Sequence, residues 1–184
     1  MTDETRQHMA SNEPNVDEFQ PRLDRYDQYL ESPESYFKRI QHLIPGLDCD
    51  VVDQWLYEHW QQHEQFRWLN FKQIYSTRET WTLTEILESG LQDHPVIQQY
   101  KDFYANGGYS PRLRRIATFF ELNRTWPKAP IILENLSGKL TLPNYMALER
   151  PFHLLEGHHR FAVFSTYAER GQLAPNHDVW IIRG

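Results

Sequence analysis

The residues with the clearest chemical potential lie in one short segment, residues 154–162, which reads Leu-Leu-Glu-Gly-His-His-Arg-Phe-Ala. The apolar residues before Glu156 predict a strand, Gly157 predicts a sharp turn, and the residues after Arg160 predict a helix. The N-terminus of a helix has unpaired N–H groups and a partial positive charge, so it attracts anions. This segment therefore predicts a phosphate-binding turn.

Each polar side chain of this segment suits such a site. Gly157 lets the backbone approach a ligand closely, and Arg160 can hold a phosphate through two parallel hydrogen bonds. His158 and His159 can donate to phosphate oxygens or move a proton near neutral pH. Glu156 can hold Mg²⁺ or accept a proton from a hydroxyl group. The candidate phosphate-binding residues are Gly157, His158, His159 and Arg160, and the candidate catalytic residues here are Glu156, His159 and Arg160.

Residues 156–162 resemble the signature of the ParB/sulfiredoxin superfamily, whose members include ParB N-terminal domains, sulfiredoxin and ADP-dependent free-serine kinases. The predicted elements over residues 75–184 also follow a similar order, with strands at 81–86, 130–133, 153–155 and 179–182, helices up to residue 120, and a helix at 161–170. The resemblance implies a ParB/sulfiredoxin-like mixed sheet with helices. It also implies a bound nucleotide (ATP, ADP or CTP) with Mg²⁺, and phosphoryl transfer or nucleotide hydrolysis.

The chain departs from this family at two points. Sulfiredoxin has a catalytic cysteine directly after the motif glycine, whereas this chain has His158 there and its only cysteine is Cys49. Sulfiredoxin chemistry is therefore not expected. Relatives place a basic residue after the first strand, but residues 87–90 are acidic here. The free-serine kinases use a glutamate near that region as a base, so the resemblance makes Glu85 and Glu88 further candidate catalytic residues.

Local signals predict the elements that position the segment. Ser32 and Ser110 each precede a proline and are suited to cap helices, and a further helix is predicted from Asp50. Alternating and apolar runs predict the strands, and the cluster at residues 106–108 predicts a turn. We expect an α+β fold with a disordered tail at 1–18, a helical N-terminal unit at 19–70 and a ParB/sulfiredoxin-like domain at 71–184.

Charge is distributed unevenly over the 184 residues, whose formal net charge is −6. Residues 1–70 contain 14 acidic and 6 basic residues, and residues 71–184 contain 11 acidic and 13 basic residues. An acidic chain without a helix-turn-helix pattern is not expected to bind DNA. The sequence has no apolar run of membrane-spanning length and no signal-peptide pattern, so we expect a cytoplasmic protein without a membrane partner.

A non-enzymatic function on the same scaffold is the alternative. The acidic, aromatic N-terminal third could bind a basic protein partner, as immunity proteins and antitoxins do. Its aromatic residues are interpreted mainly as core, with an exposed patch as the second possibility. The arginines Arg112, Arg114 and Arg115 form either a solvated helix face or part of an anion site. His59 and His63 share a helix face, but they lack the pattern of a zinc site, so no metal is predicted.

Overall fold

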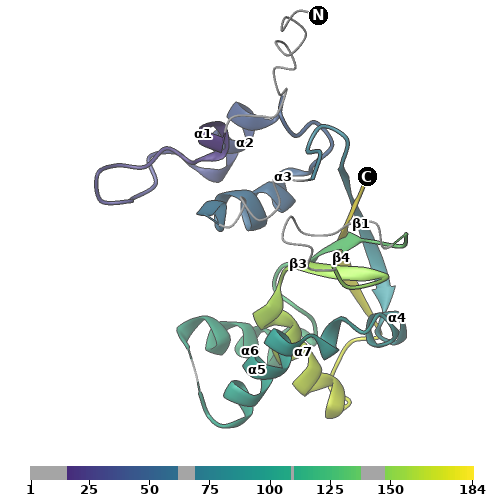
Figure 1. Ribbon diagram of the computed structural model, residues 1–184. Helices are drawn as coiled ribbons and strands as arrows, with labels where there is room; N and C mark the ends of the chain where they lie inside the picture. Colours follow the sequence, from purple (N-terminus) through teal and green to yellow (C-terminus); the bar gives the residue numbers. More distant parts are fainter. Residues whose placement is uncertain (1–15, 62–68, 109, 138–147) are drawn as a thin grey trace, which may run out of the picture.

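A computed structural model describes residues 16–61, 69–108, 110–137 and 148–184, and Figure 1 shows their arrangement. The fold is α+β, as predicted, and is built on a mixed sheet with the strand order β1-β4-β2-β3. The outer pairs β1·β4 and β2·β3 are antiparallel, and the central pair β2·β4 is parallel. The four strands are β1 (Tyr75–Thr82), β2 (Ile131–Glu134), β3 (Phe152–Glu156) and β4 (Asn176–Arg183).

Helices cover both faces of this sheet (Figure 1). On one face, the helices form a core with Ile132, Leu154 and Ile181. The residues of alternate register, such as Ile131 and Ile182, face the N-terminal helices instead. The covering helices of the first face are α5 (Pro95–Ala105), α6 (Pro111–Asn123) and α7 (His158–Glu169). The N-terminal part contains α1 (Val16–Phe19), α2 (Pro33–Ile40), α3 (Cys49–Val51) and the π-helix η1 (Val52–Tyr57).

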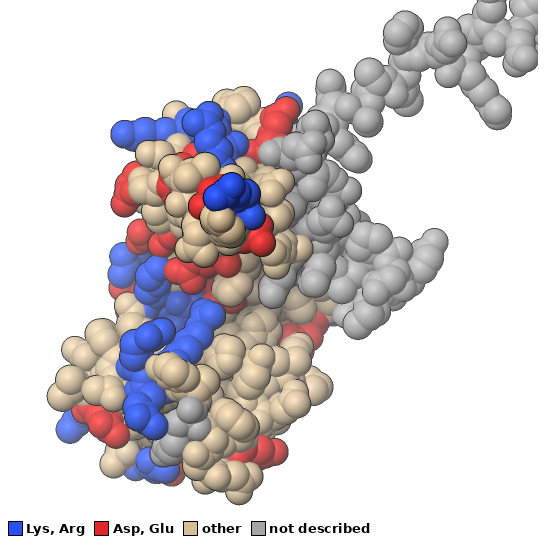
Figure 2. Space-filling view, turned by 90° about the vertical axis from the view of Figure 1, so that its left-hand side faces the viewer, with Lys and Arg blue, Asp and Glu red and all other residues tan. Residues whose placement is uncertain are grey.

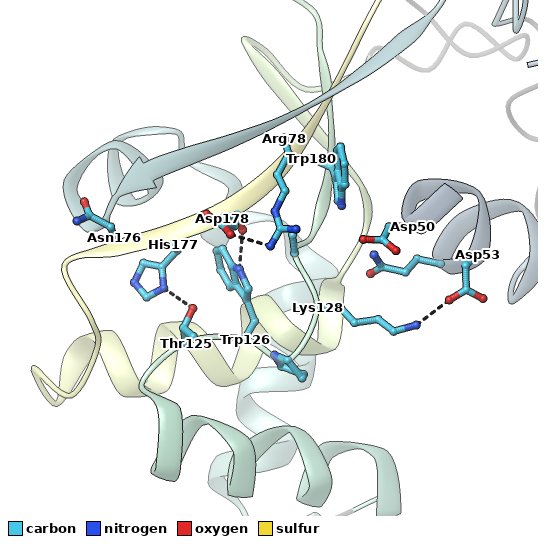
Figure 3. A pocket seen from close by; sticks show the side chains of 13 residues that line it. Asp50, Asp53, Arg78, Thr125, Trp126, Lys128, Asn176, His177, Asp178 and Trp180 are labelled. Carbon is cyan, nitrogen blue, oxygen red and sulfur yellow. Dashed lines mark hydrogen bonds and ion pairs between the residues drawn. The ribbon is translucent and has the colours of Figure 1, made fainter. Parts of the chain in front are cut away.

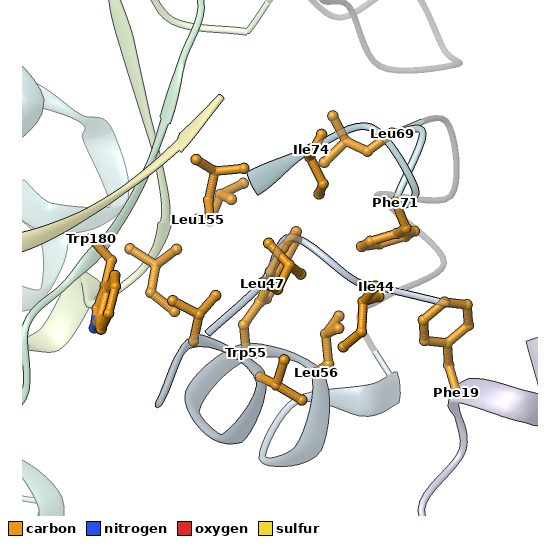
Figure 4. Close-up of a cluster of buried hydrophobic side chains, with 14 of the residues drawn as sticks. Phe19, Ile44, Leu47, Trp55, Leu56, Leu69, Phe71, Ile74, Leu155 and Trp180 are labelled. Carbon is orange, nitrogen blue, oxygen red and sulfur yellow. The ribbon is translucent and has the colours of Figure 1, made fainter. Parts of the chain in front are cut away.

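The N-terminal helices share one apolar core with the sheet, as Figure 4 shows. Trp55 of η1 and Phe71 lie with their ring centroids 5.9 Å apart, and Phe19 packs on the other side of Phe71. Leu155 and Trp180 of the sheet belong to the same cluster. The parts of the chain before and after residue 70 therefore pack together around one core.

The predicted first strand ends earlier than expected. Residues 81–86 were expected to be extended, but β1 ends at Thr82 and Leu83–Glu88 form helix α4. Thr82 and Glu85 form a capping box: the Thr82 hydroxyl accepts from the Glu85 N–H, and the Glu85 carboxylate accepts from the Thr82 N–H. This reciprocal pair starts a helix immediately after the alternating stretch, so the prediction of a strand over residues 83–86 is wrong.

Three further predictions concern the helix caps, the N-terminal tail and the aromatic residues. The caps at Ser32 and Ser110 are confirmed, since both side chains accept backbone hydrogen bonds at the start of α2 and α6. Of the predicted tail, residues 1–15 lie outside the described residues, whereas Val16 already lies in α1. The aromatic residues Trp55 and Tyr57 are buried, as predicted.

Among the described residues, none of the helices combines the length and apolarity needed to cross a lipid bilayer.

Candidate functional site

The turn at Gly157 is built as the sequence predicts, with strand β3 before it and helix α7 after it. The helix begins at His158, three residues earlier than expected, so the two histidines and Arg160 form its first turn. Gly157 has a φ of 119°, and none of the described side chains caps the helix. A Cβ atom at residue 157 would lie 2.8 Å from the Pro130 Cβ. Only glycine fits this backbone and this spacing.

Arg160 is buried against the N-terminal helices and does not reach out into solvent. Only 7% of the residue is exposed. Its Nη1 donates to the Gln54 Oε1 at 2.7 Å, and its Nη2 donates to the Glu156 Oε1 at 3.4 Å. Its Nε has no hydrogen-bond partner among the described residues. Burial lowers the pKa of Arg160, opposed by Glu156, but a guanidinium stays charged at neutral pH.

Glu156 is surrounded by three basic side chains. Its Oε1 lies 3.3 Å from the Arg112 Nη2, and its Oε2 lies 3.6 Å from the His59 Nε2. Burial alone would raise the pKa of Glu156, but His59, Arg160 and Arg112 outweigh it and hold that pKa at about 2. A carboxylate with so low a pKa stays ionised and is a weak base. Glu156 is therefore suited to fix the two arginines rather than to accept a proton.

The two histidines of the turn are held by aromatic and histidine neighbours. His159 stacks on Tyr100 with ring centroids 4.1 Å apart, and His158 meets His94 edge-on at 5.5 Å. Burial lowers the pKa of His158 to about 4, and the neighbouring His94 and His153 add to this shift. Burial and then Arg112 lower the pKa of His159. Both rings are therefore neutral at pH 7, and each can donate one N–H to a ligand.

Residues of this turn line a groove of about 370 Å³. We call it the basic groove, because the described residues that line it include four cationic side chains and two carboxylates, a formal net charge of +2. Its charged residues are Arg112, Arg115, Lys128, Arg160, Glu58 and Glu156. Figure 2 shows a band of Lys and Arg side chains running down one face of the molecule. On a chain with a net charge of −6, such a local excess of positive charge attracts anions.

The basic groove brings together most, but not all, of the residues predicted from sequence. Glu156, Gly157, His159 and Arg160 line it. His158 faces His94 instead. Glu85 and Glu88 line a separate hollow with Pro151 and Arg183, so the structure does not bring them to the turn. These two candidate bases therefore lie outside the basic groove.

Sequence reasoning missed three contributors to the site. Gln54 and His59 come from the N-terminal part, and Lys128 comes from the segment between α6 and β2. The spacing of His59 and His63 drew attention to His59 as a metal ligand, and not as a partner of Glu156. His63 lies outside the described residues.

Comparisons with protein-family models, with curated proteins and with solved structures found no match to this chain. The resemblance of residues 156–162 to the ParB/sulfiredoxin superfamily thus stays a prediction that rests on the motif and on the order of elements.

Proposed function

We propose that this protein binds a phosphate-bearing ligand in the basic groove, with nucleotides as the first class to screen. The observation that carries this proposal is the charge of the groove, where Arg112 and Arg115 of α6 meet Lys128 and the first turn of α7. Phosphate binding needs several N–H donors that converge on one place. The groove offers such donors from three separate elements.

The two arginines of α6 have guanidinium N–H donors that are available to a ligand. Arg112 and Arg115 are three residues apart, so they project from the same side of the helix. The Arg112 side chain is 42% exposed, and its ion pair among the described residues is with Glu156. The Arg115 side chain is exposed, and no hydrogen bond or ion pair joins it to another described residue. A guanidinium has five N–H donors, so both residues can bind a phosphate without giving up an existing contact.

Arg160 contributes from the floor of the groove. Its unpaired Nε lies beside Gly157, where a Cβ atom would approach that nitrogen to 3.3 Å. A buried donor without a partner costs free energy, and a ligand oxygen that accepts from it recovers that cost. Because residue 157 is glycine, no Cβ atom crowds this nitrogen.

The groups around the groove favour binding over proton transfer. Glu156 is ionised and tied to two arginines, and the histidines of the turn are neutral at pH 7. If a reaction occurs here, the protein would contribute positioning and charge stabilisation, as in phosphoryl transfer. Phosphoryl transfer or nucleotide hydrolysis is accordingly the reaction class to assay once binding has been established.

The test is isothermal titration of the wild-type protein with ATP, ADP, CTP, GTP and inorganic phosphate, with and without Mg²⁺, at two salt concentrations. We expect at least one ligand to bind, with an affinity that falls as salt rises, because phosphate contacts in an open groove are screened. Binding that does not respond to salt would contradict the proposal, and so would the absence of binding to every ligand.

A second candidate function, the binding of a protein partner, is supported by one observation. The segment before α2 projects from the molecule (Figure 1) and exposes Tyr26, Tyr29 and Leu30. Exposed tyrosines are typical of binding surfaces. The two acidic residues Asp24 and Asp27 of this segment are balanced by Arg22 and Arg25, so the exposed aromatic and apolar side chains, and not the charge, favour a partner here. Removing Tyr26 and Leu30 together should abolish the capture of such a partner while leaving phosphate binding unchanged.

A further inference from the structure

A second hollow, of about 410 Å³, lies beside the basic groove, and the two share Pro127 and Lys128. We call it the polar hollow. Figure 3 shows that its side chains come from the N-terminal helices on one wall and from β1, β4 and the segment after α6 on the other. The side chains that determine its chemistry are Asp50, Asp53, Arg78, Thr125, Lys128, Asn176, Asp178 and Trp180.

The charges of the polar hollow are nearly balanced. Three carboxylates and two cations line it, and most of them are paired with one another. The Arg78 Nη2 donates to the Asp178 Oδ2 at 2.8 Å, and the Lys128 Nζ donates to the Asp53 Oδ2 at 2.9 Å. The hollow therefore differs from the basic groove, because it offers no excess of positive charge to a second phosphate.

Both donors and acceptors remain available in the polar hollow. The Asp50 carboxylate and the Asn176 amide are exposed and make no side-chain hydrogen bond to any other described residue. The Lys128 ammonium has three N–H groups, and Asp53 and Glu58 take two of them. The Asp50 carboxylate can only accept, the Lys128 ammonium can only donate, and the Asn176 amide can do both. A hydroxyl group both donates and accepts, so a molecule with several hydroxyls matches this lining.

We infer that the ligand of the basic groove is a phosphorylated polyol, such as a sugar phosphate, whose hydroxyl groups occupy the polar hollow. This inference rests on the proposed phosphate binding. Lys128 lines both hollows, so it can contact both parts of one ligand. A hollow of this volume is within the range of small-molecule sites. A ribose 5-phosphate unit meets the description, so nucleotides are included.

The test compares phosphate esters of equal charge that differ in their hydroxyl groups. Glucose 6-phosphate, ribose 5-phosphate and ethyl phosphate are titrated into the wild-type protein and into the variants Asp50→Ala and Asn176→Ala. The control variant Glu88→Ala removes an exposed acidic residue outside both hollows. In the wild type we expect at least one sugar phosphate to bind about tenfold more tightly than ethyl phosphate, because several hydroxyl hydrogen bonds are added.

In Asp50→Ala and Asn176→Ala that advantage should shrink to about threefold or less, while ethyl phosphate binds as it does to the wild type. In Glu88→Ala the advantage should persist. Equal binding of the sugar phosphates and ethyl phosphate by the wild type overturns the inference and leaves phosphate binding intact, as does an advantage that survives both variants. Failure of all three esters to bind overturns the proposed function as well.

Discussion

Gln54 accepts a hydrogen bond of 2.7 Å from Arg160, although the two residues are 106 positions apart in the sequence. Gln54 lies in the π-helix η1, and Arg160 lies in the first turn of α7. This hydrogen bond joins the N-terminal helices to the turn at Gly157. Because both side chains are buried, the bond fixes the guanidinium beneath the basic groove.

Removing the Gln54 amide should destabilise the fold. In Gln54→Ala a buried charged donor loses its best acceptor, which costs about 1.5–3 kcal/mol of unfolding free energy. Urea denaturation followed by circular dichroism measures the change. Gln99→Ala is the matched control, because Gln99 is exposed, and we expect a change within about 0.5 kcal/mol there. Equal stability of the two variants would show that the buried hydrogen bond has no energetic role.

Gly157→Ala should be more costly than the replacement of a glycine that has open space around it. An alanine at residue 157 adds a contact of 2.8 Å with Pro130 to an unfavourable φ of 119°. We expect a loss of about 3 kcal/mol or more. Gly90→Ala is the control, since its φ is 73° but nothing lies within 4 Å of the added Cβ, so only about 1 kcal/mol should be lost. Thermal denaturation of both variants separates crowding from backbone strain, and a smaller loss at residue 157 than at residue 90 would contradict this account.

Glu156 should make the stability of the protein depend on acidic pH. Its pKa is about 2 in the folded protein and near 4.5 in the unfolded chain. A depressed pKa gives stability that is fully present above pH 4.5 and is lost as pH falls toward 2. This contribution is on the order of 3 kcal/mol. Relative to the wild type, Glu156→Gln should therefore be less stable at pH 7, and the difference should shrink between pH 5 and pH 2. A difference that is constant over this range would mean that the carboxylate is not held by its basic neighbours.

Glu85 should be required for folding of α4 rather than for ligand binding. Glu85→Ala removes half of the capping box with Thr82 and should lower the free energy of unfolding. Glu88→Ala, on the same helix but outside the cap, should cost less than about 0.5 kcal/mol. Neither variant should alter phosphate affinity, since neither residue lines the basic groove. Loss of turnover in Glu85→Ala alone, with full stability, would restore it as a candidate base.

Most strands and helices after residue 75 could be predicted because they have local signals. Ser110 and the proline after it mark the start of α6, and the apolar run at Ile131 marks β2. The end of β1 could not be predicted from alternation alone, because the alternating residues also contain the capping pair Thr82 and Glu85. The alternation favours a strand there, whereas the capping box favours a helix, and the structure contains the helix.

The candidate site could be predicted only in part, for a related reason. The motif at residues 156–160 is contiguous, so its turn and helix follow from local rules. The contacts of Glu156 with His59 and Arg112 join residues 97 and 44 positions away, and no local spacing encodes them. The same holds for Gln54, whose position on a π-helix differs from the one that ordinary helical periodicity predicts. The role of Arg160 as a link between the N-terminal helices and the turn emerges only from the packing.

The most direct test of phosphate binding in the basic groove compares two charge reversals on α6, Arg115→Glu and Arg114→Glu. Both arginines are exposed neighbours on the same helix, and both variants have the same formal net charge, but only Arg115 lines the groove. The measurement is the affinity for the tightest-binding phosphate ligand, by calorimetry at low salt. We predict a loss of about tenfold or more in Arg115→Glu and a change of less than about threefold in Arg114→Glu. An equal effect of the two substitutions would contradict the account, because the ligand would then be responding to the overall charge of the protein and not to this groove.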